Sequence, residues 1–207
     1  LGLPVRLHDY LPLKKKFDLR HYEFHLSFSE TLSDDLNRII ENIDSEETIS
    51  VHLPDYIPGN RLLDPISRDK DTREFSRKII ENVSSWCEKV QQKVHKKVNI
   101  VGSFSCTHNH KKEDNLDEIF DFISSSKITI LPQWLPVYAW YFGGTMKLNL
   151  FNSVEDINYL QENDLKICLD FSHLVMASSY YKKDWRDWFE ALRGNIEHIH
   201  ISDAADD

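Results

Sequence analysis

The sequence predicts an α/β fold, a parallel (β/α)8 barrel whose eighth strand and helix are missing from this chain. Short apolar segments alternate with helix-like segments along nearly all of the 207 residues, which is typical of parallel strands joined by right-handed crossovers. The strands are apolar along most of their length, as in sheets covered by helices. A doubly wound open sheet is the alternative. It usually needs a glycine-rich turn after its first strand, but none of the six glycines lies between Gly2 and Gly59.

Seven strands are predicted from short runs of apolar, β-branched and aromatic residues. In chain order they are Pro4–Leu7, Tyr22–Leu26, Thr48–Leu53, Val98–Phe104, Lys127–Leu131, Lys166–Leu169 and Glu197–Ile201. The sequence ends at SDAADD, directly after the seventh strand. We therefore expect residues 1–207 to form a single barrel domain that is incomplete at its C-terminus.

Five helices are predicted between these strands. In chain order they are Ser33–Asn42, Thr72–Lys96, Leu116–Ser124, Ser153–Gln161 and Asp184–Leu192. The second carries an apolar stripe with a period of 3.6 residues, which indicates one face packed on a core. Ser153 opens the fourth helix as a capping-box variant with Asp156 in the third helical position, and Gly194 is placed to stop the fifth.

The composition indicates a soluble globular protein. Hydrophobic residues make up 41% of the chain and aromatic residues 12%, which is too apolar for a disordered tail. No run approaches the roughly 18 apolar residues of a membrane span, and the N-terminal segment LGLPVRLHDY is unlike a signal peptide. We expect a cytoplasmic location and no membrane partner.

Charge and cysteine content narrow the classes of partner. The formal net charge of −9 opposes nucleic-acid binding, because such binding draws much of its affinity from lysine and arginine on phosphates. The three cysteines, Cys87, Cys106 and Cys168, are widely spaced and lack a CxxC pair. Neither a disulfide framework nor a cysteine zinc knuckle is indicated, so free thiols are expected.

Polar residues that could bind a ligand follow six successive predicted strands at the same end. In a parallel barrel the chemistry gathers at the carboxyl ends of the strands. The residues are His25 after the second strand, His52 and Asp55 after the third, His108 and His110 after the fourth, Gln133 after the fifth, Asp170 and His173 after the sixth, and His198 or His200 with Asp203 after the seventh. Any one histidine alone is more often an ordinary loop or core residue, but the repetition favours a site.

Imidazole and carboxylate groups converging from neighbouring strands suit a divalent metal such as Zn²⁺ or Mn²⁺, or general acid and base work on a polyol. Strand alternation places His198 and His200 on one face of the seventh strand. An aspartate that leaves a buried strand, as Asp170 does, needs donors or a cation to compensate its charge. The structural alternative is that Asp170 only caps the next element.

Three segments resemble the xylose isomerase-like superfamily of TIM barrels, which includes endonuclease IV and sugar isomerases and epimerases. KICLDFSHLVMASSY is similar to the sixth-strand signature of that group, HIHISDA to its seventh-strand motif, and ISVHLPDYIPGN to its third-strand turn. The resemblance implies that Asp170 and His200 are metal ligands. It implies that His173 and His52 are ligands or substrate contacts.

Two departures from this superfamily bear on the metal. Members with a working site usually present a glutamate at the end of the fifth strand, where this chain has Pro132 and Gln133. A neutral amide keeps an acceptor oxygen but lacks the charge that holds a divalent cation. The fourth strand offers Ser103 or Ser105 where endonuclease IV has a histidine. A divalent metal (Zn, Mn or Mg) is therefore expected at a site that has partly degenerated, and no organic cofactor is indicated.

The segment after the fifth strand, WLPVYAWYFGG, is dense in aromatic residues. Exposed aromatics of this density form stacking platforms for sugar rings or a lid, and the structural alternative is a hydrophobic plug at the barrel mouth. Together with the openings PVRLHDY and YEFHLS, the segment resembles a branch of the superfamily fused to sialic-acid-synthase-like proteins of surface-polysaccharide pathways.

These observations predict a sugar or sugar-phosphate isomerase or epimerase in carbohydrate or surface-polysaccharide metabolism. We expect His52 and His173 to be catalytic, Asp170 and His200 to bind metal, and four residues to contact the substrate: His25, Gln133, Trp134 and Trp140. The alternative is a non-catalytic sugar-binding or regulatory barrel fused to a sialic-acid-synthase-like enzyme. A DNA-repair endonuclease of the endonuclease IV type is disfavoured by the net charge and by Gln133.

Overall fold

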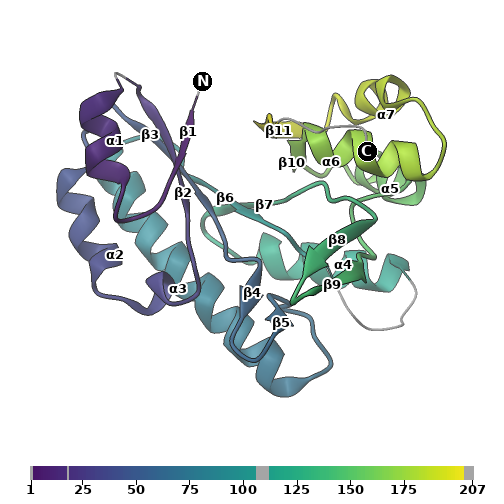
Figure 1. Ribbon diagram of the computed structural model, residues 1–207, viewed down its shortest axis with the longest axis horizontal. Helices are drawn as coiled ribbons and strands as arrows, with labels where there is room; N and C mark the ends of the chain where they lie inside the picture. The colour runs from purple at the N-terminus through teal and green to yellow at the C-terminus, as the bar shows by residue number, and fades with distance from the viewer. Residues whose placement is uncertain (1, 18, 106–111, 203–207) are drawn as a thin grey trace.

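The computed structural model describes residues 2–17, 19–105 and 112–202. Seven parallel strands of this part form the wall of a barrel (Figure 1). They are β1 (Leu3–Val5), β2 (His21–His25), β3 (Thr48–His52), β6 (Asn99–Gly102), β7 (Thr129–Pro132), β10 (Ile167–Asp170) and β11 (Ile196–His200). The prediction of a parallel barrel fold is confirmed, and all seven predicted strands are present with slightly shifted ends.

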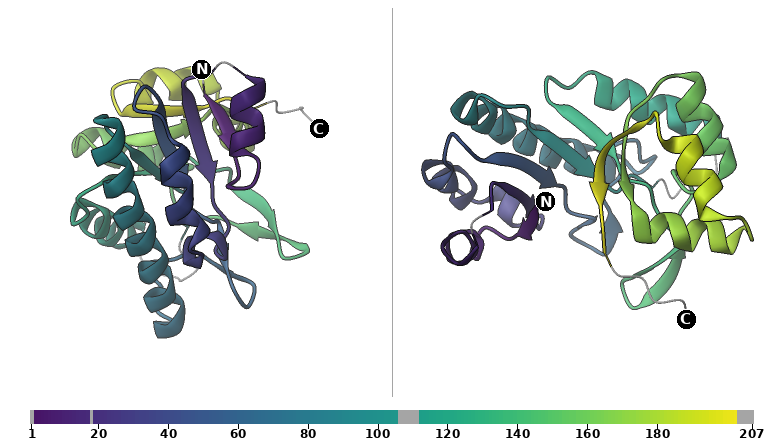
Figure 2. Two further views of the ribbon diagram at one scale, coloured as in Figure 1. Left: turned by 90° about the vertical axis from the view of Figure 1, so that its left-hand side faces the viewer. Right: turned by 90° about the horizontal axis from the view of Figure 1, so that it is seen from above.

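The wall is built from two parallel sheets that continue into each other. The first has the order β1-β2-β3-β6-β7 and the second pairs β10 with β11. They meet where Gln133 bridges Cys168 and the Trp134 amide donates a 2.8 Å hydrogen bond to the Cys168 carbonyl. β11 and β1 form the two ends of this curved wall (Figure 2), and no described residues pair them, so the barrel is not closed.

Helices cover the outer face of the wall (Figure 2). They are α1 (Tyr10–Lys16), η1 (Glu30–Leu32), α2 (Asp35–Arg38), η2 (Ile39–Asn42), α3 (Lys70–Val94), α4 (Lys112–Ser124), α5 (Val154–Glu162), α6 (Phe171–Tyr180) and α7 (Trp185–Leu192). None of the helices in these described ranges is long and apolar enough to cross a membrane.

Local sequence determines where the long helix α3 begins and ends. It begins after Asp69, whose side chain accepts a 2.8 Å hydrogen bond from the Thr72 amide, and it ends before His95, which has a left-handed φ of 54°. Its predicted apolar stripe is buried against the sheet. The predicted capping box at Ser153 and Asp156 is also present.

The predicted end of the fifth helix is confirmed, because α7 ends at Leu192, two residues before Gly194. Three other expectations for the helices need correction. The segment predicted as a helix over Ser33–Asn42 is a short α2 followed by the 3-10 turn η2. Helix α1 was not predicted, because it is short and buries only Tyr10. Helix α6 was not predicted either, since two serines on its buried face blur the apolar stripe.

Two hairpins project from the carboxyl ends of the strands. One joins β4 (Tyr56–Ile57) to β5 (Arg61–Leu62), and the other joins β8 (Tyr138–Tyr141) to β9 (Gly144–Lys147). The β8–β9 turn has positive φ at both Phe142 and Gly143, which suits the right-handed twist of a tight hairpin. The aromatic segment expected as a loop is thus largely a hairpin.

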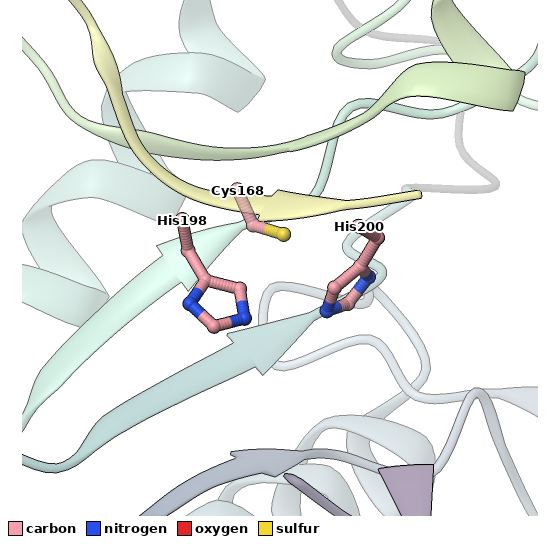
Figure 3. Close-up of side chains that lie close together, drawn as sticks. All are labelled: Cys168, His198 and His200. Carbon is pink, nitrogen blue, oxygen red and sulfur yellow. The ribbon is translucent and has the colours of Figure 1, made fainter. Parts of the chain in front are cut away.

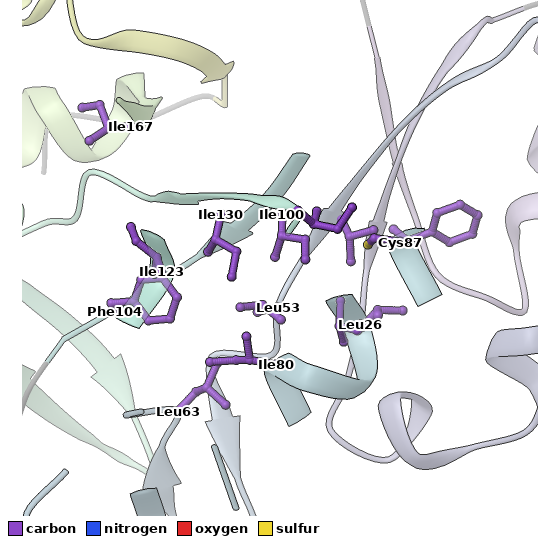
Figure 4. Packing of buried hydrophobic residues seen from close by; sticks show 14 of the residues in the cluster. Leu26, Leu53, Leu63, Ile80, Cys87, Ile100, Phe104, Ile123, Ile130 and Ile167 are labelled. Atoms are coloured by element: carbon purple, nitrogen blue, oxygen red, sulfur yellow. The ribbon is translucent and has the colours of Figure 1, made fainter. Parts of the chain in front are cut away.

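Apolar residues pack in two places. The main core lies between the sheet and the helices (Figure 4) and includes the outward side chains of β2, Tyr22 and Phe24. A small cluster of Val101, Leu131 and Cys168 lies inside the barrel. Because side chains alternate along a strand, the residues between the outward ones face the barrel interior. On β2 these are His21, Glu23 and His25.

Candidate active site at the carboxyl ends of the strands

The structure brings five predicted site residues together from five strands. His25, His52, Asp170 and His200 are the last residues of β2, β3, β10 and β11, and Gln133 directly follows β7. The imidazole rings of His25 and His52 are stacked with centroids 4.8 Å apart, and those of His52 and His200 lie 5.8 Å apart. Parallel strands carry their carboxyl ends to one rim of the barrel, which explains this convergence.

The side-chain amide of Gln133 lies at the centre of this group and is almost fully buried. Its Oε1 atom lies 2.9 Å from both the Ser103 hydroxyl, which donates to it, and His52 Nε2. Its Nε2 atom donates to Asp170 Oδ2 at 3.1 Å and lies 3.2 Å from His200 Nδ1. The amide therefore joins residues from four other strands and the segments that follow them.

The arrangement around Gln133 also tests whether Asp170 and His200 fit a metal ion. Asp170 Oδ2 and His200 Nδ1 lie 4.0 Å apart, and the N–H group of Gln133 stands between them. An N–H group turned toward both ligand atoms uses the lone pairs that a cation needs. As arranged, this pair does not fit a metal, and its predicted metal-binding role stays a prediction that requires the amide to turn away.

Glu23, which was not predicted as a site residue, is the charged centre of the interior. One carboxylate oxygen, Oε2, accepts hydrogen bonds of 2.8 Å from Ser50 and His198. The other, Oε1, is 2.8 Å from Nε2 of both His25 and His200. Strand alternation held the signal, since Glu23 is two residues before His25 on the same face of β2.

Hydrogen bonding decides the charge of Glu23. Burial alone would raise the pKa of this carboxyl group, but hydrogen bonds from His198 and His25 and the close approach of the His200 imidazole outweigh burial and hold the pKa well below its ordinary value. The carboxylate is therefore ionised throughout the physiological range. It gives the barrel interior a fixed negative charge surrounded by imidazoles.

Asp170 has both a structural and a polar role. Its Oδ1 atom caps α6 by accepting hydrogen bonds from the His173 amide at 3.1 Å and the Ser172 hydroxyl at 2.7 Å. Its Oδ2 atom accepts from Gln133. The same carboxylate therefore caps a helix and belongs to the polar group, while its predicted metal-binding role stays a prediction.

His173 has one ring nitrogen fixed by the backbone. Its Nδ1 atom lies 3.0 Å from the Trp134 carbonyl. A carbonyl only accepts, so Nδ1 carries the proton and Nε2 is left as an acceptor. The described residues offer no hydrogen bond to Nε2, and the side chain is 28% exposed.

A cavity of about 270 Å³ opens above these residues. His25, His52, Gln133 and His173 line its inner part, and the residues of its rim include Arg6, Asp55, Tyr56 and Tyr141. Burial and the nearby Asp55 carboxylate raise the pKa of the Tyr141 phenol. The cavity thus presents histidines below and both signs of charge at its rim.

The two predicted substrate-binding tryptophans do not line this cavity. Trp134 is fully buried and packs edge-on against Trp188 of α7. Trp140 is 72% exposed on β8, and the neighbouring Ala139 and Tyr141 face the cavity instead. A stacking role for either tryptophan stays a prediction that the geometry does not support. His108, His110 and Asp203 lie outside the described residues.

A second group of possible metal ligands shares His200 with the strand-end group and extends one layer deeper into the barrel. It consists of Cys168, His198 and His200, whose ligand atoms lie within 4.8 Å of one another (Figure 3). Cys168 and His198 are partners in the β10–β11 register. Together with Gln133 and Asp170, which caps α6, these three residues form a continuous polar interior.

The arrangement of strands and strand-end residues agrees with the comparison to known families. The model of the xylose isomerase-like TIM barrel family matches residues 14–207. The chain belongs to this family. Within a xylose isomerase-like barrel, the carboxyl ends of the strands are the expected place for a site, and the cavity lies there.

Solved structures share the fold of this xylose isomerase-like barrel. A D-tagatose 3-epimerase-like protein has a TM-score of 0.65 and 16% identity, over 98% of this chain and 76% of that one. An L-ribulose 3-epimerase has a TM-score of 0.60 and 14% identity, over 97% and 69%. SacUVDE has a TM-score of 0.59 and 13% identity, over 97% and 68%. At these identities the likeness shows the fold alone. No curated protein sequence matches the chain.

Proposed function

We propose that this barrel is an isomerase or epimerase of a small sugar or sugar phosphate. The observation that carries the proposal is the cavity of about 270 Å³ floored by His25, His52, Gln133 and His173. Its size suits one small polar molecule rather than a polymer. Two fold neighbours, the D-tagatose 3-epimerase-like protein and L-ribulose 3-epimerase, support this choice of chemistry.

Epimerisation beside a carbonyl moves a proton. A base removes the proton from the carbon next to the carbonyl, the electron pair passes to the carbonyl oxygen as an enediolate, and an acid returns a proton on the opposite face. The reaction needs two groups that exchange protons near neutral pH. Histidine is the side chain best matched to that range.

Among the described histidines that line the cavity, His173 and His25 each have a ring nitrogen available to a ligand. His173 offers Nε2, because its Nδ1 is fixed by the Trp134 carbonyl. His25 offers Nδ1, because its Nε2 lies 2.8 Å from Glu23 Oε1. Glu23 orients the His25 ring through this contact, so His25 acts as the acid when His173 acts as the base.

His52 differs from these two histidines. Its Nδ1 lies 2.7 Å from the Leu53 carbonyl and its Nε2 lies 2.9 Å from Gln133 Oε1. Both ring nitrogens therefore face acceptors of the protein. A direct catalytic role for His52 requires Gln133 to release it, and in the arrangement described here His52 positions the amide and stacks on His25.

Proton exchange with solvent tests the proposal directly. The chain would be incubated in D₂O with a panel of ketoses and their phosphates, and NMR would follow deuterium entering the carbon beside the carbonyl. We expect exchange with at least one sugar, and a loss of about 10²- to 10⁴-fold in His173→Asn. His8→Asn, which changes an exposed histidine, is the matched control. If no sugar exchanges, or if both variants behave alike, the catalytic proposal fails.

A second candidate is a non-catalytic sugar-binding or regulatory barrel fused to a sialic-acid-synthase-like enzyme. Gln133 favours it, because a neutral amide contacts both Asp170 and His200 where a metal site would use a charged carboxylate. Calorimetric binding of a sugar without deuterium exchange would support this candidate over the enzyme.

A further inference from the structure

The interior of the barrel contains a cluster whose chemistry differs from that of the cavity above it. We propose that Cys168, His198, His200 and Glu23 form a Zn²⁺ site one layer below the predicted active site. The three thiol and imidazole ligand atoms lie within 4.8 Å of one another (Figure 3). Cys168 and His198 face each other across the β10–β11 register, so the backbone fixes their approach.

The ligand types select the metal. Thiolate and imidazole ligands are typical of tetrahedral zinc, whereas Mg²⁺ and Ca²⁺ prefer oxygen ligands. Zinc ligand bonds of about 2.0 to 2.3 Å place neighbouring ligand atoms about 3 to 4 Å apart. The ligand atoms now lie within 4.8 Å of one another, and rotation of the side chains would bring them into this range.

Glu23 supplies the fourth ligand. Its two carboxylate oxygens lie 2.8 Å from Nε2 of His198 and 2.8 Å from Nε2 of His200. An ion bound by both imidazoles is consequently beside this carboxylate. One thiolate and one carboxylate balance the two charges of Zn²⁺, which matters for an ion held away from water.

His200 has a buried ring nitrogen that an ion would coordinate. Its Nδ1 atom faces Gln133, so Nε2 is the nitrogen turned toward the proposed ion. Nε2 lies 2.8 Å from Glu23 Oε1, but outside the geometry of a hydrogen bond. The charge of the carboxylate stabilises this nitrogen, and coordination would add a directed bond.

The thiol of Cys168 must lose its proton when the ion binds. Burial, together with the charges of Glu23 and Asp170, raises the pKa of this thiol well above its ordinary value. Without metal the group is therefore a neutral thiol. On binding, the S–H bond breaks, the sulfur lone pair forms the bond to zinc, and the thiol proton passes to buffer. The Nε2 protons of His198 and His200, which face Glu23, pass to buffer or move to Nδ1, so that the Nε2 lone pairs become ligands.

Cobalt is the probe, because a thiolate bound to Co²⁺ gives a near-ultraviolet charge-transfer band that oxygen and imidazole ligands do not give. Metal-stripped chain would be titrated with Co²⁺ and then with Zn²⁺. We expect one equivalent of Co²⁺, a charge-transfer band, the visible spectrum of a tetrahedral ion, and loss of both signals as Zn²⁺ displaces it. This readout does not depend on sugar turnover, so it stands or falls apart from the proposed function.

Matched variants locate the ligands. Cys168→Ser should lose the charge-transfer band, while Cys87→Ser and Cys106→Ser should retain it. His198→Gln should weaken Zn²⁺ binding by more than about 100-fold, since even changes outside the ligand shell cost about 10- to 100-fold. A wild-type protein without the band, or a band that survives Cys168→Ser, would overturn the proposal.

X-ray absorption on the zinc-loaded wild type covers the case in which Cys168→Ser does not fold. We expect one sulfur at about 2.3 Å and the remaining ligands as nitrogen or oxygen. A first shell without sulfur contradicts the site. Zinc coordinated by sulfur in the wild type, lost in His198→Gln, supports it.

Discussion

The amide nitrogen of Gln133 donates a 3.1 Å hydrogen bond to Asp170 Oδ2 and lies 3.2 Å from His200 Nδ1, so a neutral amide joins the two predicted metal ligands. The amide thus contacts both side chains through its N–H group. This relationship links the carboxyl ends of β7, β10 and β11. It also makes the site sensitive to the charge at position 133.

Gln133→Glu should create affinity for a hard divalent ion. The substitution supplies the carboxylate that Gln133 lacks, and the new charge repels Asp170 until a cation is bound. We expect Mn²⁺ affinity measured by calorimetry to rise at least about tenfold, with lower thermal stability in chelator and recovery with Mn²⁺. Gln92→Glu, an exposed position on α3, is the control. Equal Mn²⁺ binding by wild type and Gln133→Glu would contradict this role for the amide.

Glu23→Gln should destabilise the protein strongly. The variant removes a buried charge that accepts from His198, Ser50 and His25, and breaking one side of a buried ionic group costs about 3 to 5 kcal/mol. Urea unfolding at pH 7 measures the change in the free energy of unfolding. Glu74→Gln, on an exposed helix face, should change it by less than about 0.5 kcal/mol. A cost below 1 kcal/mol at Glu23 would show that the histidines do not depend on it.

The ionisation of Glu23 should also make the free energy of unfolding depend on pH. The pKa of Glu23 is lowered in the folded state, so below the ordinary glutamate value of about 4.3 the unfolded chain binds more protons than the folded chain. This contribution to stability is complete above that pH and is lost as the pH falls. We expect the free energy of unfolding to decline more steeply between pH 5 and 3 in wild type than in Glu23→Gln. Parallel curves for the two proteins would contradict the shift.

Asp170→Asn separates the two roles of Asp170. The new side chain keeps an oxygen to cap α6, but its NH₂ group faces the NH₂ group of Gln133, so we expect a loss of about 1 to 3 kcal/mol and weaker sugar binding. Chemical unfolding and sugar calorimetry measure the two effects. Asp184→Asn, which changes the cap of α7, controls for the loss of a charged cap. If stability and sugar binding are both unchanged, Asp170 is only a helix cap.

The two tryptophans should respond in opposite ways to truncation. Trp134→Ala removes a fully buried ring that packs on Trp188, and we expect a loss of about 3 to 5 kcal/mol. Trp140→Ala removes an exposed ring, so stability should change by less than about 0.5 kcal/mol and sugar affinity should be unaltered. Lower sugar affinity in Trp140→Ala would restore the stacking role predicted from sequence.

Duplex DNA should not bind at physiological salt. The net charge of −9 opposes association with phosphates, which depends on displaced counterions. Fluorescence anisotropy with an abasic duplex at low and at physiological salt measures this. Tight binding whose affinity falls steeply with salt would favour the endonuclease class instead.

Much of the fold was predictable because its local rules are strong. Seven apolar strands in alternation with helices predicted the barrel, and the predicted capping box at Ser153 depends on Asp156, only three positions along the chain. Helix α6 was missed because serines interrupt its buried face and because it follows β10 without a loop.

The sequence by itself determined which residues face the barrel interior, since alternation along a strand is a property of the extended backbone. It placed His25, His52, Asp170 and His200 at strand ends, and the same rule points to Glu23. Only the tertiary structure decided which of these side chains meet. Glu23 and His198 are 175 positions apart, and their contact exists because the closing curve of the sheet brings β11 back to β2. Hydrogen bonds form only between atoms a few ångströms apart, and the spacing of residues along the chain does not show which distant residues come that close.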